Sequence, residues 1–151
     1  MSTFTNSLNI TCSSATEQLG TYLEFVSFTP TVSGSTVAGA GTYTTQLGRY
    51  TKVGKLVFIE TNIVWTAHTG TGNLLLTSLP FTVRNQASYV PYAPTVNLIN
   101  APLGAGVAFI VCQFTLNTTQ GSLLGIRNNN TNLATAMDVA ATLQVSGWYV
   151  T

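Results

Sequence analysis

The chain has 151 residues, which is enough for one domain with a single sizeable core. Only 6% of its residues are charged and 45% are hydrophobic, whereas an ordinary soluble domain is about 25% charged. Its net charge is +1, no basic stripe is present to neutralise nucleic-acid phosphates, and no apolar run approaches the roughly 18 residues of a membrane span. The composition therefore argues against nucleic-acid binding and against membrane insertion.

The scarcity of charge favours self-association. Charged side chains and a net charge away from zero keep monomers apart in solution, and this chain has little of either. We therefore expect part of the surface to be buried against copies of the same chain in a closed symmetric oligomer. The alternative is a monomer that Ser, Thr, Asn and Gln side chains keep soluble.

Residues 1–21 are polar and mixed, and they predict an N-terminal arm or connector that precedes one domain over residues 22–151. Met1–Leu8 lacks the basic and apolar regions of a signal peptide. A protein made in the cytoplasm that works outside cells would then get there by lysis or as part of a particle. The two cysteines, Cys12 and Cys112, allow one disulfide at most, and because Cys112 lies in an apolar run we interpret both as free thiols.

Short alternating segments between turn signals predict an all-β domain. In the first half, strands are expected over 22–28, 42–46, 49–51, 56–66 and 73–77, and a loop is expected over 31–41. Gly48 permits a bend before the third of these strands, and Gly54 supplies positive φ in the turn that follows it. In the second half, strands are expected over 95–99, 107–116, 120–126 and 141–150, while 133–137 is ambiguous between a helical turn and a loop. The pattern predicts a two-sheet antiparallel sandwich.

The segment 56–66 is the longest expected strand, and its two faces differ. One face is predicted to be core and carries Val57, Ile59, Thr61, Ile63 and Trp65. The other face carries Leu56, Phe58 and Val64, together with Glu60 and Asn62, which would point to solvent or to a subunit interface. In the closing strand the expected core residues are Leu143, Val145 and Trp148.

Residues suited to catalysis are few. A Ser-His-Asp triad would need His68 and Asp138, but no Gly-x-Ser-x-Gly elbow is present, and we interpret His68 as an exposed loop residue. Glu24 and Glu60 lie on expected strands and, as neighbours, would form the candidate carboxylate pair of a glycosidase. One histidine and two distant cysteines do not supply a metal site. We therefore expect no catalytic residue, no metal and no cofactor.

Aromatic residues in loops give the stronger functional signal. Tyr89 and Tyr92 lie in a Tyr- and Pro-rich loop and combine ring faces with hydroxyl groups, on which sugars can stack and form hydrogen bonds. Arg84 in the same loop, and His68 and Asn73 around a Thr-Gly loop, complete the predicted ligand-binding set. The alternative is that the tyrosines anchor their loop or pack on a neighbouring subunit.

The central part of the chain also carries a family pattern. It begins with Gln46, Gly48, Tyr50-Thr51-Lys52 and Gly54, continues with a hydrophobic strand and Thr69-Gly70-Thr71-Gly72, and closes with Leu79-Pro80-Phe81. This order resembles the C-terminal domains of phage and virus fibre proteins. The upstream Phe28–Gly34 and the terminal Val145–Tyr149 look like the opening and the last strand of that family.

The resemblance implies a jelly-roll sandwich similar to the C1q and tumour-necrosis-factor heads, assembled as a homotrimer on a virion. It also implies a non-enzymatic head that binds host-surface glycans or receptors through exposed loops. The apolar outer face of the segment 56–66 fits such a trimer, and we expect Leu56, Phe58 and Val64 to face the threefold axis or a neighbouring chain. The family has no fixed set of binding residues, so none is transferred. Two alternatives stay open: a purely structural trimeric component of a capsid or fibre, and a tail-associated glycan hydrolase.

Overall fold

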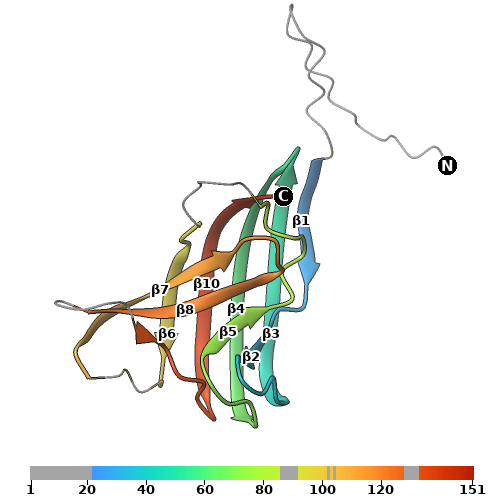
Figure 1. Ribbon diagram of the computed structural model, residues 1–151. Coiled ribbons are helices and arrows are strands. Elements are labelled where there is room, and N and C mark those ends of the chain that lie inside the picture. Colours follow the sequence, from blue (N-terminus) through green and yellow to red (C-terminus); the bar gives the residue numbers. More distant parts are fainter. Residues whose placement is uncertain (1–21, 86–91, 102, 104, 128–132) are drawn as a thin grey trace, which may run out of the picture.

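The computed structural model describes residues 22–85, 92–101, 103, 105–127 and 133–151, and every regular element within them is a strand (Figure 1). The strands are β1 Tyr22–Phe28, β2 Thr31–Gly34, β3 Gly41–Val53, β4 Leu56–His68, β5 Leu74–Thr77, β6 Thr95–Ile99, β7 Val107–Thr115, β8 Gln120–Arg127, β9 Leu133–Ala134 and β10 Ala141–Val150. The prediction of an all-β domain is confirmed for these residues. They contain no helix long and apolar enough to cross a membrane.

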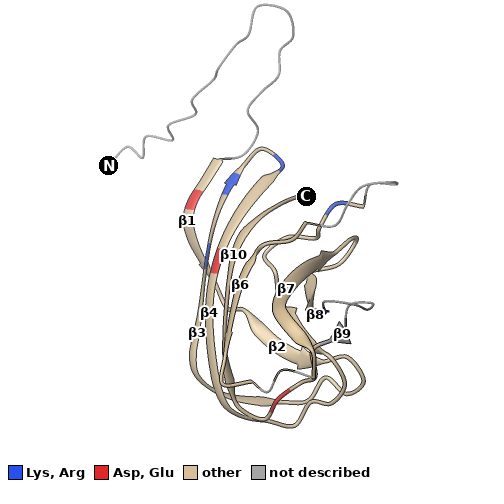
Figure 2. Cartoon of the chain, turned by 90° about the vertical axis from the view of Figure 1, so that its left-hand side faces the viewer, with Lys and Arg blue, Asp and Glu red and all other residues tan. Residues whose placement is uncertain are grey.

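The strands form two antiparallel sheets that face each other, as Figures 1 and 2 show from two sides. The first sheet has the strand order β1-β3-β4-β10-β6. The second sheet has the order β2-β5-β8-β7, with β9 paired to β8. The predicted two-sheet antiparallel sandwich is therefore confirmed.

The hairpin of β3 and β4 is the centre of the first sheet. Its register runs from Val53 opposite Leu56 to Gly41 opposite His68. Gly54 has a φ of 59° in the connecting turn, as predicted, because glycine adopts this left-handed conformation without a steric penalty.

Gly48 does not bend the chain, contrary to the prediction, since β3 is continuous from Gly41 to Val53. Glycine is needed there for packing, because a Cβ atom on Gly48 would lie 2.7 Å from the Phe28 ring. Phe28 ends β1 and packs against the core, with its ring centre 6.2 Å from that of Tyr50. The glycine therefore allows β1 to dock on the hairpin.

Two segments that lack a strand signal join the second sheet. The predicted loop over 31–41 begins with β2, which pairs with β5 from Thr31 opposite Thr77 onward. The ambiguous segment 133–137 contributes β9, and Ala136 forms a bridge with Asn73. Both segments are short and mostly polar or small, so their pairing depends on partners that are distant in the sequence and not on a local pattern.

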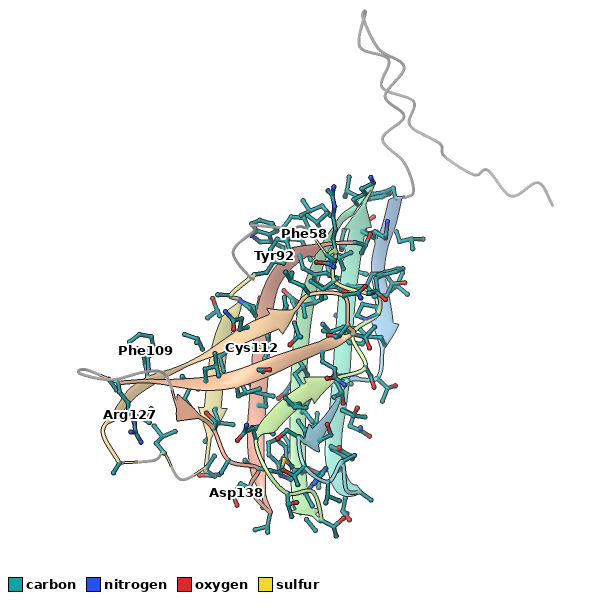
Figure 3. The ribbon with its side chains drawn as sticks, in the orientation of Figure 1. Phe58, Tyr92, Phe109, Cys112, Arg127 and Asp138 are labelled. Atoms are coloured by element: carbon teal, nitrogen blue, oxygen red, sulfur yellow. The ribbon has the colours of Figure 1, made fainter. Side chains whose placement is uncertain are left out.

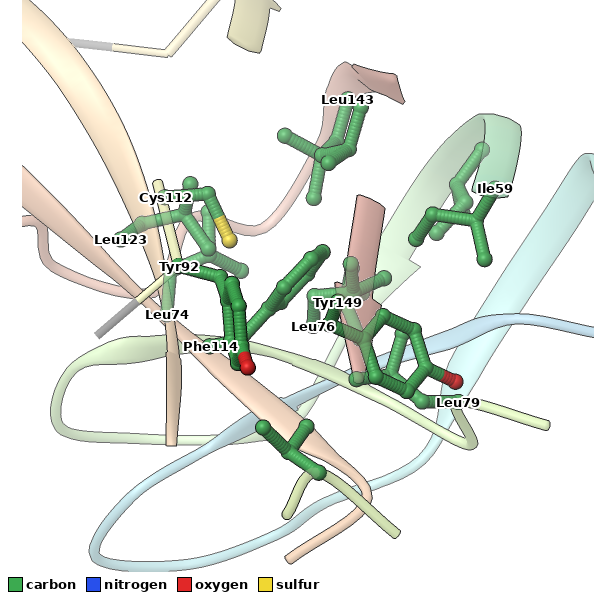
Figure 4. Close-up of a cluster of buried hydrophobic side chains, with 14 of the residues drawn as sticks. Ile59, Leu74, Leu76, Leu79, Tyr92, Cys112, Phe114, Leu123, Leu143 and Tyr149 are labelled. Carbon is green, nitrogen blue, oxygen red and sulfur yellow. The ribbon is translucent and has the colours of Figure 1, made fainter. Parts of the chain in front are cut away.

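The core lies between the two sheets (Figure 4). The predicted inner face of β4 is confirmed: Val57, Ile59, Ile63 and Trp65 are at most 1% exposed, and Thr61 is 8% exposed. The indole Nε1 of Trp65 donates a hydrogen bond to the backbone carbonyl of Asp138 at 3.0 Å. From the second sheet, Phe114 meets Tyr149 edge-on, with the ring centres 5.3 Å apart.

Cys112 of β7 is fully buried and is not part of a disulfide. Burial raises the pKa of its thiol to about 12, because the thiolate would be poorly solvated among apolar side chains. The predicted buried free thiol at this position is confirmed. Cys12 and the predicted arm over residues 1–21 lie outside the described residues.

Trp148 is not a core residue, contrary to the prediction. Alternation along β10 buries Leu143, Val145 and Tyr149, so the residue before Tyr149 points to the opposite face. Trp148 is 48% exposed and lies opposite Phe58 of β4. The core position at this end of β10 belongs to Tyr149.

Candidate functional site

The predicted ligand-binding residues are divided between the two ends of the sandwich. Arg84 lies at the end where β10 finishes, because its backbone N–H donates a hydrogen bond to Val150. His68, the last residue of β4, and Asn73 lie at the other end. A 13-residue strand such as β4 spans roughly 40 Å, so these residues cannot form one site.

His68 is a buried structural residue and not the exposed loop histidine that the sequence predicts. Its Nε2 lies 3.1 Å from the carbonyl oxygen of Val32, and its Nδ1 accepts a hydrogen bond from the N–H of Gly70 at 2.9 Å. Since Nδ1 is an acceptor, the neutral ring carries its proton on Nε2 and donates it to Val32. Both nitrogens are thus occupied by backbone groups, and neither is available to a catalytic triad or to a ligand.

Tyr92 is also buried, and its ring is covered by its neighbours. It packs edge-on against Trp148, with the ring centres 5.3 Å apart. Its backbone carbonyl accepts a hydrogen bond from the N–H of Phe114. This geometry matches the alternative in which the tyrosine anchors its loop. Arg84 and Asn73 are exposed, and Tyr89 lies outside the described residues.

A different set of side chains comes together on the side of the first sheet that faces away from the second sheet, which we call the outer face. It is the left-hand surface of the sandwich in Figure 2. The predicted interface residues Leu56, Phe58 and Val64 share this face, as alternation along β4 requires. Phe58 is 45% exposed, and Leu56 and Val64 are half-buried.

One end of the outer face is rich in apolar side chains, and we call it the aromatic end, although the Glu24 carboxylate also lies there, beside Tyr22. It consists of the exposed side chains Tyr22, Phe25, Phe58 and Trp148, together with Leu56. Phe58 and Trp148 lie directly opposite each other on β4 and β10, which places their backbones about 5 Å apart. The ring of Tyr92, from the loop before β6, packs against Trp148 (Figure 3 labels Phe58 and Tyr92).

A β-bulge turns Phe25 toward solvent. The register of β1 on β3 shifts between Leu23 and Val26, so that two residues of β1 oppose one residue of β3. Phe25 has a φ of 49° there, and its side chain is 64% exposed. A left-handed conformation of a non-glycine residue costs on the order of 1 kcal/mol. The fold therefore retains a strained backbone that presents an apolar ring to the surroundings.

The middle of the outer face is polar, and we call it the polar centre: Arg49, Glu60, Asn62, Asn97 and Gln144. Arg49 of β3 lies directly opposite Glu60 of β4, and both side chains are exposed. The amide of Asn97 donates a hydrogen bond to Gln144 at 3.0 Å, and the amide of Gln144 donates one to Asn62 at 3.4 Å. The three amides form a ladder across β6, β10 and β4.

A surface depression of 450 Å³ lies beside the polar centre, where β1 leaves the first sheet. Arg49, Glu60 and Asn62 line it, and Leu47, which is 65% exposed, adds an apolar side chain. Gln46 forms part of its wall, and its amide donates a hydrogen bond to the carbonyl of Pro30 at 3.2 Å. This contact holds the departing chain against β3.

Charged residues concentrate on the first sheet (Figure 2). Glu24, Arg49, Lys52, Lys55 and Glu60 lie on β1, β3 and β4 or in the turn between the last two. The remaining described charges are spread over the rest of the molecule, at Arg84, Arg127 and Asp138. The first sheet therefore carries most of the described charge, although the Lys52 ammonium lies over the Phe81 ring, 5.5 Å from its centre, and not on the outer face.

Glu24 and Glu60, the candidate carboxylate pair, do not lie on neighbouring strands. β3 lies between β1 and β4, so at least two strand spacings, roughly 10 Å, separate the two backbones. Glycosidase carboxylates lie about 5 to 9.5 Å apart with nothing but the substrate or a water between them, whereas Arg49 stands opposite Glu60 on the intervening strand. In the described part of the chain, no three His, Cys, Asp or Glu side chains are grouped to hold a metal ion.

No family model, no curated protein and no solved structure matches the chain. The sequence reasoning missed Arg49, Asn97, Gln144 and Trp148 as residues of the outer face. The pairing of Arg49 with Glu60 follows from the turn at Gly54, because a tight turn sets the hairpin register. Asn97 and Gln144 carry no such signal, since their strands are far from β4 in the sequence.

Proposed function

We propose that the protein is the non-enzymatic head of a virion fibre, which assembles as a homotrimer through the aromatic end and binds a glycan or receptor on the host surface. The observation that carries the proposal is the aromatic end itself. Large apolar side chains that are exposed together on a soluble chain mark a contact surface. Phe58 and Trp148 are such a pair, because they are adjacent on the outer face and each is close to half exposed.

The strand order supports a jelly-roll topology for this head. Consecutive strands from β4 to β7 alternate between the two sheets. The later strands then insert between earlier ones, β8 between β5 and β7, and β10 between β4 and β6. A jelly roll carries its chain back and forth between two sheets in this manner, so the order agrees with the resemblance to fibre heads.

We assign the subunit contact to the aromatic end and not to all three predicted interface residues. Leu56 and Phe58 belong to the aromatic end, whereas Val64 lies beyond Glu60 on the same strand. A contact that extended to Val64 would bury the Glu60 carboxylate, which is costly without a partner. A contact centred on Phe58 and Trp148, with Glu24 at its solvent-exposed rim, removes mainly apolar surface from water, which is favourable by about 25 cal/mol per Å².

The mass of the protein in solution tests the assembly. The wild type should have three times the 16.0 kDa mass of one chain. Phe58→Glu places a carboxylate in the contact and should give monomers or aggregates in light scattering. Phe109→Glu is the matched control, because Phe109 is 55% exposed but lies on β7 of the second sheet. A wild-type monomer, or a normal trimer of Phe58→Glu, would overturn the assignment.

The same aromatic end would also serve a purely structural trimeric component of a virion, so the binding activity needs its own test. Reproducible and competable binding of the trimer to sugars on a glycan array supports the receptor-binding head. A correct trimer that binds no glycan and no host-cell surface supports the structural component.

A further inference from the structure

We infer that the depression beside the polar centre is a binding site for a neutral hexose unit of a glycan. The inference rests on the proposed glycan-binding function and assigns it a place on the first sheet. At 450 Å³, the depression falls within the range of about 300 to 1,000 Å³ that is usual for small-molecule sites.

The charged groups of the depression are not used by the fold. The guanidinium of Arg49 and the carboxylate of Glu60 lie on opposed residues of neighbouring strands, yet neither forms a hydrogen bond or an ion pair with another residue that the structure describes. They are the only charged side chains among the lining residues. Two opposite charges that are free to bind and close together favour a ligand without net charge that both donates and accepts hydrogen bonds.

The hydroxyl groups of a hexose meet this requirement. A carboxylate accepts hydrogen bonds from two adjacent hydroxyls, and a guanidinium donates to hydroxyl or ring oxygens, in bonds that are stronger than those between neutral groups. A charged sugar gains no net attraction from this pair, because an acidic sugar attracted by Arg49 is repelled by Glu60, and an amino sugar attracted by Glu60 is repelled by Arg49. Neighbouring Ser27 and Thr29 add hydroxyl groups to the same lining.

The amide ladder holds Asn62 in a fixed orientation for this role. Its Oδ1 accepts the hydrogen bond from Gln144, and Gln144 is itself held by Asn97. The Nδ2 of Asn62 therefore keeps both of its N–H donors for a ligand in the depression. A donor that is already oriented loses little conformational freedom on binding, which favours affinity.

Leu47 supplies the apolar part of the site. It lies opposite Asn62 on β3 and is 65% exposed, although the removal of a leucine side chain from water is favourable. The C–H face of a pyranose ring is the apolar surface that a single exposed leucine can cover. Polar groups on one side and Leu47 on the other would then orient the sugar.

The test measures binding of the full chain to the methyl glycosides of glucose, galactose and mannose by NMR titration, with glucuronic acid as the acidic probe. We expect at least one neutral glycoside to bind and glucuronic acid to bind more weakly. Glu60→Gln and Arg49→Met should each weaken binding by about tenfold or more, the cost of losing one charged hydrogen bond. Lys55→Met is the control, because Lys55 lies in the β3–β4 turn outside the depression, and it should leave the affinity unchanged.

Three outcomes would overturn the inference. If a glycoside or an array glycan binds and both variants retain the wild-type affinity, the depression is not the site, and the proposed glycan binding stands. If no sugar binds to the wild type, the glycan binding and the hexose site fail together, whereas the mass measurement decides the trimer separately. If Glu60→Gln or Arg49→Met changes the mass of the assembly, the depression belongs to the subunit contact.

Discussion

The two faces of β4 show how one strand divides stability from recognition. On the inner face, Val57, Ile63 and Trp65 are at most 1% exposed and pack under the second sheet. On the outer face, two residues apart along the same strand, Phe58 is 45% exposed and Glu60 forms no hydrogen bond or ion pair with a described residue. Burial of the inner face contributes to folding, so the outer face is free to carry groups that folding does not need.

The largest expected contrast is between the two tryptophans. Trp65→Ala should lower the free energy of unfolding by about 3–5 kcal/mol, because it opens a cavity and removes the hydrogen bond to Asp138. Trp148→Ala, on the outer face, should lower it by about 1 kcal/mol or less. Urea denaturation measures both at a protein concentration low enough for the protein to be monomeric, because the proposed subunit contact at Trp148 would otherwise add to the apparent stability. Equal losses would contradict the division between the faces.

The pH dependence of stability should come from the inner face. The pKa of Cys112 is raised from 9.0 to about 12 by burial, so between these values the unfolded thiol loses its proton while the native thiol keeps it. The unfolded state then binds fewer protons, and the free energy of unfolding falls as the pH rises. Burial also raises the pKa of Tyr149, which adds to this loss at higher pH.

Cys112→Ala removes the thiol contribution and serves as the comparison. Between pH 8 and pH 10.5 the wild type should lose about 2 kcal/mol more stability than this variant. Urea denaturation in a reducing buffer at both pH values measures the difference. Identical pH profiles of the two proteins would show that the thiol is not protected in the native state.

The tyrosine hydroxyl groups on the two faces of the first sheet should also contribute differently to the free energy of unfolding. The hydroxyl of Tyr149 donates a hydrogen bond to the carbonyl of Phe81 and accepts one from its N–H, both at 3.2 Å. Tyr149→Phe should therefore cost about 1–2 kcal/mol, because the backbone groups of Phe81 lose their partner. Tyr22→Phe at the exposed aromatic end should change stability by no more than about 0.5 kcal/mol. Thermal unfolding of the two variants provides the comparison, and a larger effect of Tyr22→Phe would contradict it.

The smallest expected effect concerns the amide ladder. Gln144→Ala removes both of its hydrogen bonds, but these are accessible to water, so the loss should stay below about 1 kcal/mol. Ser146→Ala on the same face of β10 is the control and should have almost no effect. A loss in Gln144→Ala as large as that of Tyr149→Phe would mean that the ladder serves stability, which would weaken its assignment to recognition.

Alternation along single strands is the part of the fold that sequence reasoning predicts well. The predicted inner face of β4 is confirmed, because the side chains of a strand point alternately to opposite sides independently of the rest of the chain. The same rule applied from Leu143 and Val145 already places Trp148 on the outer face. The inward position next to it is occupied by Gly147, where a Cβ atom would lie 2.5 Å from Pro94. Strict alternation along β10, and not the size of the aromatic side chain, decides that Trp148 faces outward.

The prediction that His68 is an exposed loop residue was wrong for a different reason. His68 looks like a loop residue because the Thr-Gly segment follows it, but β2 brings the carbonyl of Val32 against its ring. β2 has a single buried apolar residue, and its partner β5 follows it by some forty residues. Pairing over such a distance depends on the folded sheet and leaves no local pattern in the sequence.

The amino-acid sequence alone determined the all-β architecture, the inner face of β4, the turn at Gly54 and the pairing of Arg49 with Glu60, because each depends on neighbours in one strand or one hairpin. Only the tertiary structure decided that β10 inserts between β4 and β6. That insertion places Trp148 beside Phe58 and aligns Gln144 between Asn62 and Asn97. The aromatic end and the amide ladder are therefore products of long-range strand order, which pairs segments that the linear sequence keeps far apart.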